Sequence, residues 1–179
     1  AAERGTGAAP LEFTDHLGMP LHDALAFVKQ TLIEYDLDKH IKILAAGKII
    51  TGFDILKAMS LGAVACYSAR GMMFSLGCIQ ALQCDSGKCP VGVATQNPAL
   101  YKGLDPADKK VRVASFHLNT MKATKEMMEA CGFRSVHDVN ASKFFKRIDL
   151  LKTKNFKEIY FDGSNSKLKD QLKHSTYLN

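Results

Sequence analysis

The stretch that decides the fold runs from residue 40 to residue 74, HIKILAAGKIITGFDILKAMSLGAVACYSARGMMF. Its two short apolar runs, residues 40–47 and 63–69, are typical of buried strands in a parallel sheet. Each run leads through a glycine-containing turn into a segment with helical spacing of apolar residues. Helix and strand therefore alternate, which predicts an α/β fold with parallel strands.

The ends of the predicted helices are marked by the residues that flank them. Thr51 is suited to the N-cap of the helix between the two strands, and Asp54, three residues later, completes a capping box. Gly62 follows this helix and is expected to end it. The next helix follows Arg70 and Gly71 and is expected to run into the first cysteine of a cluster.

Helical spacing also occurs on both sides of this central unit. Residues 20–37 carry apolar residues at helical intervals, with Pro20 suited to the first turn. Residues 108–133 predict a long amphipathic helix that Gly132 closes.

The C-terminal part of the chain has weaker patterns. Residues 135–149 predict a short helix and a turn, and the Lys-, Ser- and Asn-rich end from about residue 152 has no strong pattern. We therefore expect one domain over residues 1–150 and a Lys-rich tail over residues 151–179.

The net charge is concentrated in the same region. The chain has 24 basic and 18 acidic residues, a net charge of +6, and residues 141–179 hold nine basic and four acidic residues, a net charge of +5. A solvated Lys-rich end explains this better than a nucleic-acid footprint, because no RNA-binding motif or zinc finger accompanies it. We also find no apolar run of about 18 residues and no signal-peptide pattern. The expected location is the cytoplasm, with neither nucleic acid nor membrane as a partner.

Three of the five cysteines fall in one window, CIQALQCDSGKCPVGVATQ, residues 78–96. An odd number of cysteines with three close together favours a metal or cluster site in a reducing compartment over a disulfide framework. The other two stand apart: Cys66 is interpreted as a buried small hydrophobe and Cys131, at a helix end, as structural.

The spacing within the window allows the three thiols to converge. Cys78 and Cys84 are six residues apart, about 120° from facing each other on a helix, so Cys84 must lie at or beyond the helix end. The turn at Gly87 then brings Cys89 back, and Pro90 prevents the helix from resuming. Three thiols fit a [3Fe-4S] cluster better than a [4Fe-4S] cluster or zinc, which usually takes four ligands at shorter spacing. Zinc with His117 as an additional ligand, and buried cysteines without metal, are the alternatives.

Both strand-to-helix turns have the features of an anion site. Glycine lets backbone N–H groups approach a ligand closely, and a helix N-terminus offers unpaired donors to an anion. Arg70 could add a charge-assisted pair to a phosphate. Two successive loops of this kind match the phosphate site of a (β/α)₈ barrel, which lies after strands seven and eight. Each loop alone is more often a simple turn.

The motifs GTGAAPLEF, AAGKIITGFDILKAMSLGA, YSARGMMFSLGC and C-x5-C-x4-CPVGVATQ resemble the FMN-binding domain of glutamate synthase, above all its stand-alone form, from about residue 3 to about residue 150. The resemblance implies an α/β chain that forms the C-terminal portion of an FMN-binding (β/α)₈ TIM barrel with a helical C-terminal extension. It also implies an oxidoreductase in which ammonia from glutamine condenses with 2-oxoglutarate and reduced FMN delivers hydride, giving L-glutamate.

The resemblance also assigns site residues. A [3Fe-4S] cluster would be held by Cys78, Cys84 and Cys89 and would pass electrons to the flavin. The FMN phosphate would be lined by Gly47, Lys48, Ser68, Ala69, Arg70 and Gly71, while Gly5, Thr6 and Gly7 would lie near the flavin and substrate. The implied partners are an electron donor, such as a donor subunit, ferredoxin or an NAD(P)H-linked reductase, and a separate glutaminase subunit.

Two departures from the family pattern qualify these expectations. Arg4 stands where the family usually has a second glycine. The strands that carry the flavin-ring and 2-oxoglutarate contacts in the family have no counterpart here, and neither does the glutaminase domain. We therefore expect a C-terminal part of a barrel, poorly stable in isolation because its sheet edges would be unpaired.

Other functions remain open at the level of sequence. An inactive iron–sulfur electron-transfer or binding module, a related FMN-dependent amino-acid synthase and a structural zinc module are the alternatives. The histidines do not fall in loops assigned to the flavin and are interpreted as structural, so no catalytic acid or base is assigned; they are His16, His22, His40, His117, His137 and His174.

Overall fold

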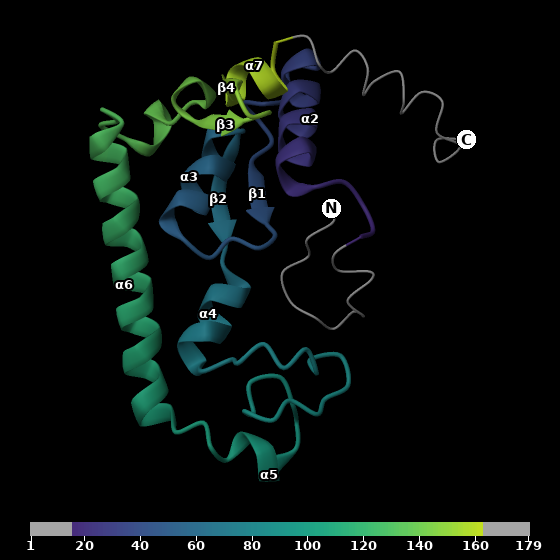
Figure 1. Cartoon of the computed structure of the whole chain (residues 1–179), viewed down its shortest axis with the longest axis vertical. Coiled ribbons are helices and arrows are strands. Elements are labelled where there is room, and N and C mark those ends of the chain that lie inside the picture. The colour runs from purple at the N-terminus through teal and green to yellow at the C-terminus, as the bar shows by residue number, and fades with distance from the viewer. Residues whose placement is uncertain (1–15, 163–179) are drawn as a thin grey trace.

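A βαβ unit lies at the centre of residues 16–162, the part of the chain that this computed structural model describes (Figure 1). Strand β1 (Ile43–Ala46) pairs in parallel with β2 (Ala63–Tyr67), and α3 (Gly52–Ser60) connects them. The alternation of helix and parallel strand predicted from residues 40–74 is therefore confirmed. Within the described residues these two strands form a two-stranded sheet.

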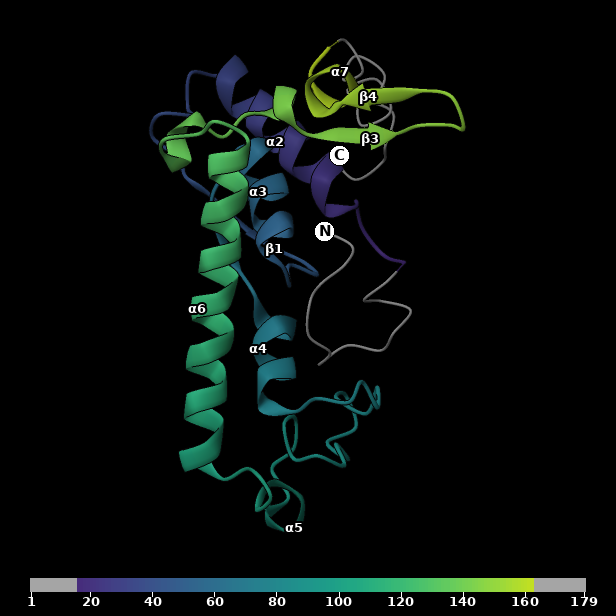
Figure 2. The same cartoon turned by 60° about the vertical axis from the view of Figure 1, so that its left-hand side comes forward.

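Helices flank this unit on two sides. Helix α2 (Leu21–Glu34) precedes β1 and contacts it, and α4 (Ala69–Leu76) follows β2. After the short α5 (Pro98–Tyr101), the 25-residue α6 (Pro106–Ala130) runs back along both α3 and α4 (Figures 1 and 2). The long helix expected over residues 108–133 is present. Helix α5 was not predicted, because four residues are too few to show helical spacing of apolar residues.

The capping signals act as the sequence predicts. The Thr51 side chain accepts from the Asp54 N–H, the Asp54 carboxylate accepts from the Thr51 N–H at 3.0 Å, and α3 begins at the next residue. At the other end Gly62 has φ +110°, which few non-glycine residues adopt. Pro20 differs slightly from expectation, since it is the N-cap of α2 and not a residue of its first turn.

Helices α3 and α6 cross at a glycine. A Cβ atom on Gly52 would lie 2.5 Å from Thr124 Oγ1 and 2.9 Å from the Thr124 backbone nitrogen. The two backbones can approach this closely only because residue 52 has no side chain. The crossing positions the C-terminal half of α6 beside the βαβ unit, while its N-terminal half lies along α4 (Figures 1 and 2).

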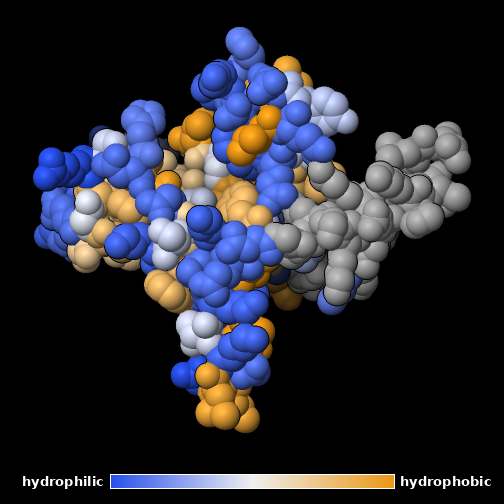
Figure 3. Space-filling model, turned by 90° about the horizontal axis from the view of Figure 1, so that it is seen from above, coloured by the Kyte–Doolittle hydropathy of each residue, from blue (hydrophilic) through white to orange (hydrophobic). Residues whose placement is uncertain are grey.

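The segment after α6 covers the end of the sheet where the strands begin (Figure 1). Its elements are the 3₁₀ turns η1 (Val136–Asp138) and η2 (Ala141–Lys143), the antiparallel hairpin of β3 (Phe145–Arg147) and β4 (Thr153–Asn155), and α7 (Phe156–Tyr160). The predicted boundary between residues 150 and 151 lies in the turn of this hairpin, whose apolar end projects from the body when seen from above (Figure 3). The sequence did not reveal the hairpin, because strands of three residues are too short to show alternation.

Aromatic packing joins this segment to the rest of the core. Phe144 and Phe156 are buried with ring centroids 6.0 Å apart, and Tyr160 stacks edge-on against Phe156. The Gln30 side chain of α2 donates to the Tyr160 carbonyl at 2.7 Å. The core is thus continuous from Leu21 and Leu25 through Leu56 and Leu61 to the C-terminal aromatics.

One face of the small sheet stays open in the described structure. Ala45 and Ala63 are buried, whereas Leu44, Val64 and Tyr67 are at least half exposed. No helix among the described residues is long and apolar enough to cross a membrane.

Candidate functional site

The carboxyl ends of β1 and β2 lie side by side, with Ala46 opposite Tyr67. The loop after β1 begins with Gly47 at φ +151° and Lys48 at φ +47°. A left-handed residue other than glycine costs about 1–2 kcal/mol, so the sharp turn at Lys48 is held by its surroundings.

A hydrogen bond joins this loop to the next one. The Ser68 hydroxyl donates to the Ile49 carbonyl at 2.8 Å. Ser68 is also the N-cap of α4, yet its side chain makes no capping bond to that helix. The N–H groups of the first turn of α4 therefore have no side-chain cap and can serve an anion.

Gly71 has a packing role as well. A Cβ atom at this position would lie 2.5 Å from Ser68 Oγ and 3.1 Å from Phe116 Cζ of α6. The glycine thus allows Ser68 and the long helix to pack against the first turn of α4. Close approach of a ligand is not required to explain it.

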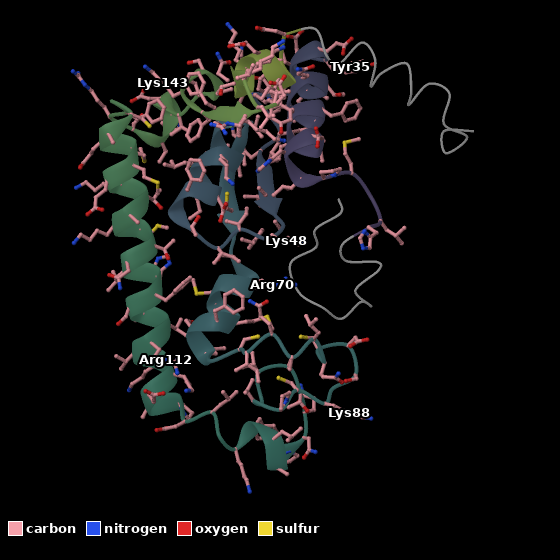
Figure 4. All side chains as sticks on the ribbon, in the orientation of Figure 1. Tyr35, Lys48, Arg70, Lys88, Arg112 and Lys143 are labelled. Carbon is pink, nitrogen blue, oxygen red and sulfur yellow. The ribbon has the colours of Figure 1, made fainter. Side chains whose placement is uncertain are left out.

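The basic residues of the two loops lie at this same end of the sheet. Figure 4 places Lys48 at the strand ends and Arg70 just beyond, at the start of α4. Both side chains are partly buried and both have interaction partners. The two loops that the sequence separated by about 20 residues are therefore brought together, with a cation on each.

Helix α4 leads directly into the cysteine loop. The helix ends at Gly77, which has φ +104°, and the Cys78 N–H donates to the Met73 carbonyl at 3.0 Å. Helix α4 is therefore slightly shorter than predicted, and Cys78 lies two residues beyond its last residue. All three cysteines of the cluster belong to the loop between α4 and α5.

Backbone N–H groups surround the Cys89 thiol. Burial alone would raise its pKa, but the backbone N–H groups of residues 91–94 lie near the thiol and lower the pKa below its usual value. The Gly92 N–H donates to the Cys89 carbonyl at 3.2 Å, which turns this backbone around the cysteine. The Cys89 side chain is buried. A lowered pKa favours the thiolate, the form in which cysteine binds metal ions.

The other cysteines of the loop lie within electrostatic range. Burial raises the pKa of the Cys84 thiol, the thiols of Cys78 and Cys89 raise it further, and the Arg70 guanidinium opposes them. The Cys78 sulfur accepts from the Gln80 N–H at 3.5 Å. Cys78, Cys89 and Arg70 therefore all lie close enough to Cys84 to shift its pKa.

The arrangement of the thiols bears on which kind of metal group they could hold. Among residues 16–162, no three His, Cys, Asp or Glu side chains are grouped closely enough to hold one ion. A tetrahedral zinc ion would need sulfur atoms about 3.8 Å apart, given Zn–S bonds of about 2.3 Å. In a cluster each thiolate binds its own iron, so the sulfur atoms lie farther apart. Three cysteines in one loop are the ligand type that iron–sulfur clusters take.

Several sequence-predicted residues lie elsewhere. His117 is exposed on α6, and the ring of His22 packs against Phe156. Gly5, Thr6, Gly7 and His174 lie outside the described residues, and so does Arg4. Cys66 is partly buried and its pKa is raised by burial to about 11, as expected of an unreactive thiol.

Comparison with known proteins decides the family. A family model described as the conserved region in glutamate synthase matches residues 2–134, well over half of the chain. The chain belongs to the glutamate synthase family. The resemblance drawn from the four sequence motifs is confirmed.

Relatives of the family carry the same name in several organisms. Over 134 residues the chain is 41% identical to the glutamate synthase large subunit-like protein YerD of Bacillus subtilis, covering 75% of this chain and 26% of that protein. It is 40% identical over 139 residues to the archaeal glutamate synthase [NADPH] of Methanocaldococcus jannaschii, covering 78% of this chain and 27% of that protein. The ferredoxin-dependent glutamate synthase of Antithamnion is 34% identical over 181 residues, covering 96% of this chain and 12% of that protein. The chain spans about a quarter of the length of the first two relatives.

The glutamate synthase match contains both loops and the whole cysteine window. Sequence reasoning nevertheless missed three contributors to the site: the Ile49 carbonyl, the N–H groups of residues 91–94, and Phe116 behind Gly71. The motif PVGVATQ was the available signal for the second, because Gly92, at φ +80°, turns the backbone of residues 91–94 back towards Cys89. The first and third depend on tertiary packing.

Proposed function

We propose that this chain is part of an FMN- and iron–sulfur-dependent glutamate synthase, which forms L-glutamate from 2-oxoglutarate and ammonia derived from glutamine. The proposal rests on one observation. The Ser68–Ile49 hydrogen bond joins the two loops at the start of α4, and α4 leads directly into a loop with three cysteines. The family match and the names of the relatives support it.

In this proposal β1 and β2 are the last two strands of an FMN-binding (β/α)₈ barrel. Parallel pairing across a helical crossover and adjacent carboxyl ends support it, because such barrels place their phosphate site after strands seven and eight. The open, apolar face of β1 and β2 is consistent with a sheet that continues in a larger fold.

The FMN phosphate would lie between the two loops. Gly47 and Lys48 would contribute from one loop, and Ser68, Ala69, Arg70 and Gly71 from the other. The uncapped first turn of α4 would supply N–H donors, and the guanidinium of Arg70 would pair with phosphate oxygens. The Ser68 hydroxyl would act mainly by holding the two loops together.

The cluster would be held by Cys78, Cys84 and Cys89. When bound, the flavin supplies hydride transfer and the cluster supplies single electrons. Helix α4 would separate the two sites, since eight residues of helix rise about 12 Å. The backbone N–H groups near Cys89 would favour its thiolate, the form that binds iron, over the protonated thiol.

The partners follow from the same proposal. An electron donor is required, either a donor subunit, ferredoxin or an NAD(P)H-linked reductase, and the named relatives include both NADPH- and ferredoxin-dependent proteins. A separate glutaminase subunit would supply ammonia. Gly5, Thr6 and Gly7 remain expected near the flavin and substrate.

Electron paramagnetic resonance of the anaerobically purified protein tests the cluster. A [3Fe-4S] cluster gives a signal in the oxidised sample that disappears on reduction. We expect that signal in the wild type and in Cys131→Ser, whose cysteine lies at the far end of α6, and its loss in Cys84→Ser. One zinc per chain without acid-labile sulfide would contradict the proposal.

Flavin retention tests the second half of the proposal. We expect the purified protein to bind FMN and the variant Arg70→Gln to retain at least ten-fold less, about 1.4 kcal/mol, because a bidentate phosphate contact is lost. A wild-type protein that assembles the cluster but binds no FMN would instead indicate an electron-transfer module.

A further inference from the structure

One side-chain hydrogen bond joins the two sides of the chain around Cys89. The Thr95 hydroxyl donates to the Gly87 carbonyl, so the segment after the cysteine is tied to the turn before it. Cys89 lies between these two residues and is buried, whereas its neighbour Lys88 points away from the body (Figure 4). The hydroxyl of Ser86, in the same turn, reaches only residues 83 and 88 and does not cross the cysteine.

The same threonine also holds the start of α5. The Asn97 N–H donates to Thr95 Oγ1 at 3.1 Å, and the Asn97 side chain accepts from the Ala99 N–H at 2.9 Å as the N-cap of α5. The Thr95 hydroxyl is therefore a donor and an acceptor at once, which a hydroxyl can be and a methyl group cannot. The turn at Gly87 and the start of α5 thus depend on one oxygen atom.

Helix α5 packs against the loop at Gly92. This glycine has φ +80°, and a Cβ atom on it would lie 2.7 Å from both the Leu100 carbonyl oxygen and Tyr101 Cα. The backbone of the loop therefore lies directly against α5, with no room for a side chain between them. A shift of α5 would move residues 91–94, whose N–H groups lie near the Cys89 thiol.

We propose that Thr95 is a positioning residue for the iron–sulfur cluster: its hydroxyl keeps the N–H groups of residues 91–94 close to the Cys89 sulfur. This inference rests on the proposed function, because it concerns the loop that would hold the cluster. Hydrogen-bond donors near the sulfurs favour the more negative, reduced state of a cluster and so raise its reduction potential. Thr95 acts through the backbone and has no contact of its own with the cluster.

A redox titration followed by electron paramagnetic resonance separates this role from a purely structural one. In Thr95→Val, which keeps the shape but loses the hydroxyl, we expect the midpoint potential to fall. The expected change is at least three-fold in the equilibrium between oxidised and reduced cluster, about 28 mV for a one-electron couple. Thr95→Ser keeps the hydroxyl and should titrate like the wild type. An unchanged potential in Thr95→Val would overturn the inference.

A matched control removes a hydroxyl elsewhere. Thr31 donates to the Phe27 carbonyl within α2 at 2.9 Å, so Thr31→Val makes the same substitution far from the cysteine loop. It should leave the midpoint potential unchanged. A fall as large as that of Thr95→Val would mean that general destabilisation moves the potential, and would overturn the inference.

Iron release to a chelator covers the case in which the potential of Thr95→Val cannot be measured. We expect this variant to lose its iron at least three-fold faster than the wild type, or to assemble no cluster, and Thr95→Ser to behave as the wild type does. Failure of both variants to hold the cluster would overturn the role of the hydroxyl. A wild-type protein without a [3Fe-4S] signal would instead contradict the proposed function, and this inference with it.

Discussion

Asp54 makes a pH-dependent contribution to stability at the start of α3. Burial would raise its pKa, but hydrogen bonds from Lys57 and Thr51 and the charge of Lys57, at 2.9 Å, lower it from 3.8 to about 2. A depressed folded-state pKa stabilises the native state above the unfolded-state pKa. The contribution is therefore complete above about pH 5 and is lost as the pH falls from there towards 2.

The variant Asp54→Asn measures this contribution. At pH 6 we expect its free energy of unfolding to be lower than that of the wild type by about 1 kcal/mol, since a charged partner of the capping box is removed. Urea unfolding at pH 6, 4 and 3 should show this difference shrinking as the pH falls. A difference that stays constant with pH would contradict the role of the carboxylate charge.

Ser68 is the residue at which the two loops of the site meet. Replacing it by alanine removes the bond to the Ile49 carbonyl and should reduce the free energy of unfolding by about 1 kcal/mol. We expect a larger effect on FMN retention, because both sides of the proposed phosphate site would shift. Ser115→Ala, an exposed serine on α6, is the control and should lower neither quantity. Equal effects of the two substitutions would rule out a specific role for the bridge.

At the scale of elements, the crossing of α3 and α6 depends on Gly52. The variant Gly52→Ala would place its methyl group against the Thr124 backbone, which cannot move without moving α6. We expect a loss of about 1–3 kcal/mol in thermal or urea unfolding, typical of overpacking. Gly103→Ala is the matched control, because nothing lies within 4 Å of its Cβ position. A stable Gly52→Ala variant would show that α6 adjusts its position freely.

Helix and loop ends were largely predictable at this scale. Thr51, Asp54 and Gly62 act through bonds to residues at most four positions away, so their roles could be read from sequence. Gly71 was predicted to line a ligand, and Gly52 carried no prediction. Gly52 packs against Thr124, and Gly71 packs against Phe116 as well as the nearby Ser68; the contacts with α6 span more than 40 residues, and no local pattern reports them.

For the molecule as a whole, the C-terminal aromatics join the last segment to the central unit. Phe156 is 4% exposed and contacts Phe144, Tyr160 and His22. Phe156→Ala should lower the free energy of unfolding by about 3–5 kcal/mol. Phe145→Ala, one residue after Phe144 but 63% exposed, should cost far less. Calorimetry should show one shifted transition for Phe156→Ala; a separate early transition would mean that the segment folds independently.

The sequence by itself determined the βαβ unit, the helix caps and the grouping of three cysteines. These depend on hydrophobic period, capping chemistry and spacing, which act over a few residues. Only the tertiary structure decided that Ser68 joins the two loops, that Arg70 lies close enough to Cys84 to shift its pKa, and that α6 packs against Gly52. Each of these depends on surfaces that meet after the chain has folded, because side-chain contacts between distant segments follow from packing and not from local pattern.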